Sequence, residues 1–118
     1  MFQSVDDISV FGLSGEVDQD EARRLAESIR NLIHSNWRKI VLDFGEVSHV
    51  HYLFLSELIP LSLVSSEKLG GIKLANLKGE IQKIFKVSGL DSFLETYDSV
   101  AEAILSFENP LTRPSVLH

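Results

Sequence analysis

The stretch KIVLDFGEVSHVHYLFLSEL, residues 39–58, decides the fold of this chain. Residues 39–44 form an apolar run that is typical of a parallel strand covered by helices on both faces. A short polar loop is expected next, and a helix from about Leu53. Such a junction often displays small polar residues that bind ligands. Here residues 51–54 read His-Tyr-Leu-Phe, so the turn is bulky and mostly apolar.

Strands and helices alternate on both sides of this stretch. Residues 2–5 and 8–13 flank an acidic pair and predict a hairpin. Asp18 and Glu21 have the spacing of a capping box, at the start of a helix over about residues 20–35. Further strands are expected at 72–75 and 93–97, and further helices at 53–69, at 79–87 and after residue 99. Because helices that cross between strands impose parallel pairing, we expect an α/β fold with a mixed, mostly parallel sheet of four to five strands, an N-terminal hairpin and about four helices.

Length and composition narrow the class of protein. The 118 residues suit one domain over residues 1–108, followed by a flexible tail over 109–118 with two prolines. The net charge of −6 argues against nucleic acid and against anionic membrane surfaces as partners. There is no cysteine, no apolar run long enough to insert into a membrane and no basic-then-apolar leader, so a cytoplasmic protein is expected.

No group of residues makes a persuasive catalytic, metal or cofactor site. His49 and His51 form a pair, but two ligands are too few for a structural zinc site. Asp43, at the end of a strand, is better explained as a cap for the following loop. The glycine positions match no phosphate-binding pattern, and no serine lies in a nucleophile elbow. We therefore expect neither enzymatic activity nor a cofactor.

The helix predicted over residues 53–69 is apolar on two faces. One face can pack on the sheet and holds Leu55, Leu58, Ile59, Ser62, Ser66 and Leu69. The other face holds Leu53, Phe54, Leu61 and Val64, beside Glu57 and Lys68. Two explanations stay open. Pro60 kinks the helix and turns part of this second set inward, or the second face binds a partner protein or a second copy of the chain.

Four segments together resemble the STAS domain, the fold of bacterial anti-sigma factor antagonists. They are LSGEVD (residues 13–18), KIVLDFGEV (39–47), GGIKLANL (70–77) and IFKVSGLDSFLETYDSVAEAI (84–104). They cover nearly the whole chain in the order of the family. The resemblance implies a regulatory, non-catalytic binding role, in which an anti-sigma factor with kinase activity docks at the start of the second helix.

The resemblance also implies a phosphorylation switch, and here the chain departs from the family. Family members carry an Asp-Ser-Ser-Gly motif at this helix start, and a partner kinase phosphorylates a serine in it. Aligning from Asp43 places the motif on residues 51–54, with Tyr52 at the phosphoacceptor position. We therefore expect no serine switch. The partner-binding residues expected from these arguments are His51, Tyr52, Leu53, Phe54, Glu57, Leu61 and Val64.

Two classes of function follow from the resemblance. The first is an antagonist that binds an anti-sigma factor or a related kinase-like protein without being switched off by serine phosphorylation. The second is a STAS scaffold, which would assemble with itself as a homodimer or with other STAS proteins in a stressosome-like body, or would serve as an accessory subunit of a transport ATPase. The first class predicts heterodimers with a kinase-like partner, and the second predicts self-association or attachment to a larger assembly.

Overall fold

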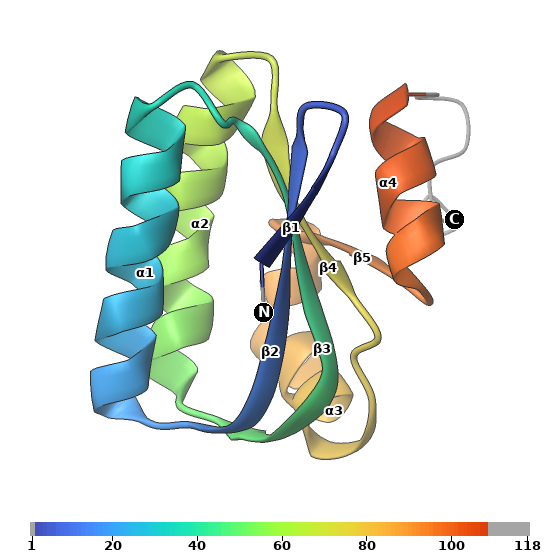
Figure 1. Ribbon diagram of the computed structural model, residues 1–118. Coiled ribbons are helices and arrows are strands. Elements are labelled where there is room, and N and C mark those ends of the chain that lie inside the picture. Colours follow the sequence, from blue (N-terminus) through green and yellow to red (C-terminus); the bar gives the residue numbers. More distant parts are fainter. Residues whose placement is uncertain (1, 109–118) are drawn as a thin grey trace.

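The computed structural model describes residues 2–108 and shows one five-stranded sheet with helices on both faces (Figure 1). In chain order the elements are β1 (Phe2–Val5), β2 (Ile8–Val17), α1 (Gln19–His34), β3 (Lys39–Val50), α2 (Tyr52–Glu67), β4 (Gly71–Ala75), α3 (Gly79–Ser88), the 3₁₀ turn η1 (Leu90–Ser92), β5 (Glu95–Tyr97) and α4 (Val100–Glu108). The strands lie in the order in which they occur, with β1 antiparallel and the others parallel. The predicted α/β fold with its hairpin is confirmed, and the expected tail over 109–118 lies outside the described residues.

Two apolar cores lie on opposite faces of the sheet because side chains alternate along each strand. In β3, Ile40, Leu42 and Phe44 point toward α1 and α2, whereas Val41 points toward α4. The larger core also takes in Ile81 and Phe85 from α3. Figure 1 shows α1 and α2 side by side on one face and α4 on the other. The continuous apolar run 39–44 is thus buried on both sides, as its composition predicts.

Strands β2 and β3 are longer than the sequence indicates. Residues 45–50 were expected as a polar loop and residues 14–17 as a link to α1, but both segments continue their strands. They pair with each other in parallel from Ser14 opposite Glu46 to Val17 opposite Val50, with one register shift just before Ser14 and another between Gly15 and Glu16. Exposed polar residues on the outer side of these extensions hide the alternation, and the expectation of a loop was wrong for that reason.

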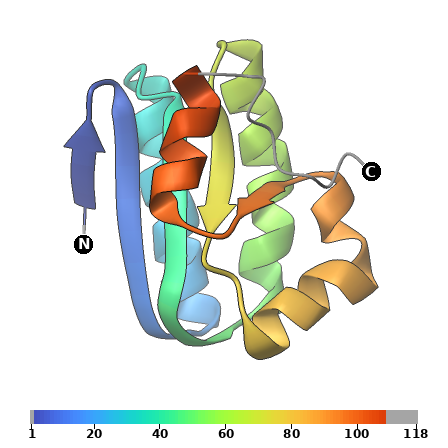
Figure 2. The ribbon, with the colours of Figure 1, turned by 90° about the vertical axis from the view of Figure 1, so that its right-hand side faces the viewer.

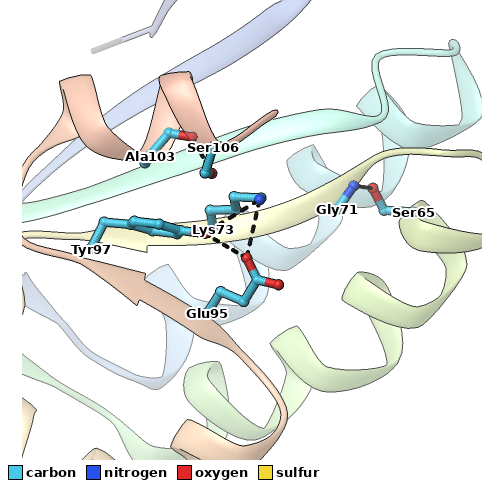
Figure 3. A network of polar contacts seen from close by, with 7 residues as sticks. All are labelled: Ser65, Gly71, Lys73, Glu95, Tyr97, Ala103 and Ser106. Carbon is cyan, nitrogen blue, oxygen red and sulfur yellow. Dashed lines mark hydrogen bonds and ion pairs between the residues drawn. The ribbon is translucent and has the colours of Figure 1, made fainter. Parts of the chain in front are cut away.

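A polar junction joins the end of α2 to the starts of β3 and β4 (Figure 3). The buried hydroxyl of Ser65 accepts a hydrogen bond from the backbone N–H of Gly71 at 2.8 Å and donates one to the carbonyl of Arg38. Gly70 passes so close to Arg38 that a β-carbon would overlap the Arg38 carbonyl oxygen. The helix was predicted to run to residue 69, just before the glycine pair. Helix α2 ends earlier, at Glu67, and Gly70 is needed for close backbone approach.

A second polar cluster fastens α4 and β5 to β4 (Figure 3). The Lys73 ammonium lies 3.1 Å from a carboxylate oxygen of Glu95 and 4.4 Å from the centre of the Phe107 ring of α4. The Tyr97 hydroxyl donates a 2.7 Å hydrogen bond to the same Glu95 oxygen. Because the Lys73 side chain is largely buried, the carboxylate and the ring together replace its lost hydration. This cluster therefore supports the packing of α4.

Candidate functional site

The turns that enter α1 and α2 lie together at the carboxyl ends of β2 and β3, at the bottom of Figure 1. Parallel strands β2 and β3 both end there, so their following helices start side by side. The backbone N–H of His51 donates a 2.8 Å hydrogen bond to the carbonyl of Val17 and joins the two strand ends. The chain therefore presents the start of α2 beside the start of α1.

His51 caps α2 with its side chain. Its backbone is extended, and its Nδ1 accepts a 3.0 Å hydrogen bond from the N–H of Leu53. An accepting Nδ1 carries no proton, so the ring proton lies on Nε2. The first turn of α2 has no acidic residue, whereas α1 is capped by Asp18 and has two acids in its first turn. The positive end of the α2 dipole is therefore met by a neutral group.

The next two residues are accessible to different degrees. Tyr52 is 53% exposed. Leu53 is half-buried and lines a cavity of about 30 Å³ with Arg23 and Glu57. A carboxylate oxygen of Glu57 lies 3.8 Å from a guanidinium nitrogen of Arg30 on α1. These residues form a surface that is apolar at its centre and charged on the side of α1.

Phe54 and Leu61 do not lie on an outward face, and that expectation was wrong. Phe54 is 0% exposed and Leu61 is 6% exposed, and both belong to the larger core. The Phe54 ring packs on Phe44, with 6.4 Å between ring centres. Helix α1 packs alongside α2, so α2 is buried against the sheet and against a neighbouring helix. The second apolar face of α2 is largely explained by α1.

The outer face of α2 is apolar in a different set of residues. Tyr52, Pro60 and Leu63 are exposed, with Leu63 at 63%, and Val64 is exposed beside them. We call these four residues the α2 outer surface. Sequence reasoning found Tyr52 and Val64 but missed Leu63. A stripe drawn from Tyr52 in steps of three and four residues reaches Leu63, and this spacing was the available signal. Leu69, expected on the sheet side, is exposed because the helix ends before it.

The other candidates from the sequence have structural roles or are dispersed. One carboxylate oxygen of Asp43 accepts 2.9 Å hydrogen bonds from the N–H of Gly45 and the side-chain amide of Asn76. Asp43 thus accepts a nearby backbone N–H as expected, but within β3 and not before a loop. Within residues 2–108, no three histidine or acidic side chains gather as a metal site. Over the same residues, no helix has the length and apolarity needed to cross a membrane.

Comparisons with known proteins agree with this architecture. The STAS domain model matches residues 1–103. The Bordetella bronchiseptica protein named anti-sigma factor antagonist BtrV is 23% identical over 109 residues, which cover 92% of this chain and 94% of that protein.

Two solved structures show the same fold. TM1081 of Thermotoga maritima superposes with a TM-score of 0.85 at 17% identity, over 92% of this chain and 94% of that one. Unphosphorylated SpoIIAA of Bacillus, an anti-sigma factor antagonist, gives a TM-score of 0.76 at 21% identity, over 88% of this chain and 91% of that one. With its fold, its element order and a family match over residues 1–103, this chain belongs to the STAS domain family.

Proposed function

We propose that this chain is a non-catalytic regulatory module that binds an anti-sigma factor or a related kinase-like protein in the cytoplasm. The contact is made by the start of α2 and the α2 outer surface, with His51, Tyr52 and Leu53 at its centre and Glu57 and Val64 at its border. The observation that carries the proposal is the exposed, mostly apolar surface that begins at the family's regulatory turn. The name of BtrV, and the anti-sigma factor antagonist SpoIIAA, support this class of partner.

We further propose that serine phosphorylation at this turn does not switch the module. SpoIIAA has been solved in phosphorylated and unphosphorylated forms. Here the exposed residue at the turn is Tyr52. The nearest serine along the helix, Ser56, is half-buried and donates a 3.0 Å hydrogen bond to the carbonyl of Leu53. Ser48 is exposed, but it lies on β3 before the turn.

The test uses two matched charge insertions. Tyr52→Glu places a carboxylate at the centre of the proposed contact, and Val87→Glu places one at a highly exposed position on α3. We expect the wild type and Val87→Glu to bind a purified anti-sigma factor kinase from the same organism in calorimetry. Tyr52→Glu should bind at least about tenfold more weakly, equivalent to about 1.4 kcal/mol. Equal affinities of all three proteins would overturn the proposed contact.

Phosphorylation is tested with the same proteins. After incubation of the wild type with the bound kinase and ATP, intact-mass spectrometry should show the unmodified mass. Stoichiometric phosphate on Ser48, Tyr52 or Ser56 would contradict the absence of a switch. A serine-containing family member phosphorylated in a parallel reaction confirms that the kinase is active.

A second candidate function is self-assembly as a STAS scaffold. It is favoured by Leu63 and Val64, which extend the apolar surface about three turns beyond the helix start. A scaffold would self-associate through this part of α2. Light scattering decides between the two: a dimer or larger species that Leu63→Glu returns to the monomer supports the scaffold.

A further inference from the structure

Part of the sheet has an open edge. Strand β1 pairs with β2 only from Ile8 to Phe11, but β2 continues to Val17. Figure 2 shows β1 beside only the upper part of β2. Among residues 2–108, no strand pairs with the outer edge of residues 13–17. An open strand edge offers backbone donors and acceptors to another extended chain.

A groove lies between this edge and α1. Its lower part is a cavity of about 190 Å³, lined by residues 11–14 and Val17 of β2 and by Glu21 and Leu25 of α1. Its upper part is a wider hollow of about 410 Å³ between Phe11 and the last turns of α1. Phe11 lines both hollows, which lie one above the other along β2 and α1. We call the two hollows together the edge groove.

The wall formed by α1 suits an apolar chain. The lining residues from α1 and its C-cap are mostly apolar or small, namely Leu25, Ser28, Leu32 and Ser35, with Asn31 beside them and Glu21 at the lower end. Leu25 and Leu32 are only half-buried. The charged residues in the middle of α1 lie on other faces, as ion pairs such as Arg30 with Glu27 at 3.2 Å. Small side chains at Ser28 and Ser35 leave room for another backbone.

We propose that the edge groove binds a short extended segment of a partner protein, which adds to β2 in line with β1 and antiparallel to β2. This mode of recognition combines backbone hydrogen bonds with pockets for alternate side chains. One face of the added strand would place apolar side chains between Leu25 and Leu13. The site is separate from the α2 outer surface, so the inference does not depend on the proposed function.

Charges at the lower end of the groove indicate the composition of the segment. Glu16 and Asp18 are exposed at the carboxyl end of β2, next in sequence to the lining residue Val17, and Asp18 also caps α1 by accepting the N–H of Glu21 at 2.9 Å. Glu21 also lies there, but it is paired with Arg24 at 2.7 Å, and this carboxylate raises the pKa of the Arg24 guanidinium. The remaining acidic excess favours a lysine or arginine. Since an antiparallel strand begins at this end, the basic residue lies near the amino end of the segment.

The same charges disfavour a second copy of this chain as the occupant. Two copies pairing antiparallel about a twofold axis near Gly15 would make their Glu16 carboxylates diagonal neighbours on one face, where like charges repel. The edge is also short and bent, because Gly15 has a φ of +70° and the β2–β3 register shifts beside it. A segment of about five residues therefore fits, and we expect an affinity in the micromolar to millimolar range.

The experiment uses the full chain and two peptides. The probe is Ac-Arg-Lys-Val-Thr-Val-Thr-Val-NH2, and the matched control replaces both threonines by proline, which removes backbone donors. In ¹⁵N-labelled protein, the probe should shift the amide signals of residues 11–17 and of the groove side of α1 in a saturable manner. The control should bind at least about tenfold more weakly. Equal binding of both peptides, no saturable shift, or shifts confined to the α2 outer surface would overturn the proposal.

A pair of variants tests the groove itself. Leu25→Lys places a cation in the groove, whereas Leu69→Lys places one at an exposed position after α2. Probe affinity should fall at least about tenfold for the first and stay unchanged for the second. If Leu25→Lys does not fold, Ser28→Lys serves in its place, because Ser28 is exposed. A groove variant that binds like wild type, or a wild-type dimer that the groove variant dissociates, would refute the peptide as occupant.

Discussion

Truncation of Phe54 tests how the turn into α2 is divided between core and surface. Phe54 is fully buried, and its ring packs on Phe44 with 6.4 Å between centres. A phenylalanine buries roughly 150–250 Å², which at about 25 cal/mol per Å² is worth about 4–6 kcal/mol. Alanine retains part of this area but leaves a cavity, so Phe54→Ala should lower the free energy of unfolding by about 3–5 kcal/mol.

That loss is large for a domain of this size. Single domains are stable by about 5–15 kcal/mol, so the variant would be near its unfolding threshold at the lower end of that range. Urea denaturation followed by circular dichroism measures the change. With an m-value of about 2 kcal/mol per M, the midpoint should fall by about 2 M. Phe54→Leu, which keeps most of the volume, should lose less than about 1.5 kcal/mol.

The matched control is Tyr52→Ala, two residues away and 53% exposed. Its stability should change by no more than about 0.5 kcal/mol. If Phe54→Ala loses less than about 1 kcal/mol with an unchanged m-value, Phe54 is not a core residue. The turn would then have a second large apolar side chain available to a partner, as the sequence alone suggests.

Three further changes test the local structure. His51→Ala removes the cap of α2 and should cost about 0.5–2 kcal/mol, whereas His51→Asn should retain most of the stability; thermal melts distinguish the two. Gly70→Ala drives a β-carbon into the carbonyl of Arg38 and should cost about 2 kcal/mol or more, while a melt like that of wild type would show that this approach is not close. Asp7 accepts from Lys39 at 3.1 Å, which lowers the Asp7 pKa. The Asp7–Lys39 pair is exposed, so it stabilises the fold by only a few tenths of a kcal/mol. Because the folded-state pKa of Asp7 is lowered, this stabilisation is present above the unfolded-state pKa and is lost as pH falls through the folded-state pKa. Asp7→Asn should therefore flatten the pH dependence of the unfolding free energy below about pH 4.5.

Much of the fold follows from local patterns in the sequence. The apolar run 39–44 predicts a strand buried on two faces, and Asp18 accepts the N–H of Glu21 at 2.9 Å, as the capping spacing requires. These features depend on neighbours along the chain. The extensions of β2 and β3 do not, because residues 14–17 and 46–50 are strands only by pairing with each other across the sheet.

The candidate site was harder to predict than the fold. Helical periodicity separates the faces of α2, but it does not say which face meets which neighbour. The position of α1 decides that Leu61 is buried and that Leu63 is exposed. His51 as a cap was also missed, since capping is usually recognised from serine, threonine, aspartate or asparagine. The open edge of β2 became visible only once the lengths of β1 and β2 were compared.

The burial of Phe54 has a consequence for how this chain can change over time. In the alignment with the family motif, the glycine position is Phe54 and the serine positions are residues 52 and 53. Serines at residues 52 and 53 would replace side chains that are at least partly accessible. Glycine at residue 54 would remove a buried ring from the core and lower the free energy of unfolding. Substitutions that refill the space beside Phe44 would have to come first. The order of mutations is thereby constrained: on the proposed alignment, a serine switch at this turn is accessible only after the space beside Phe44 has been refilled.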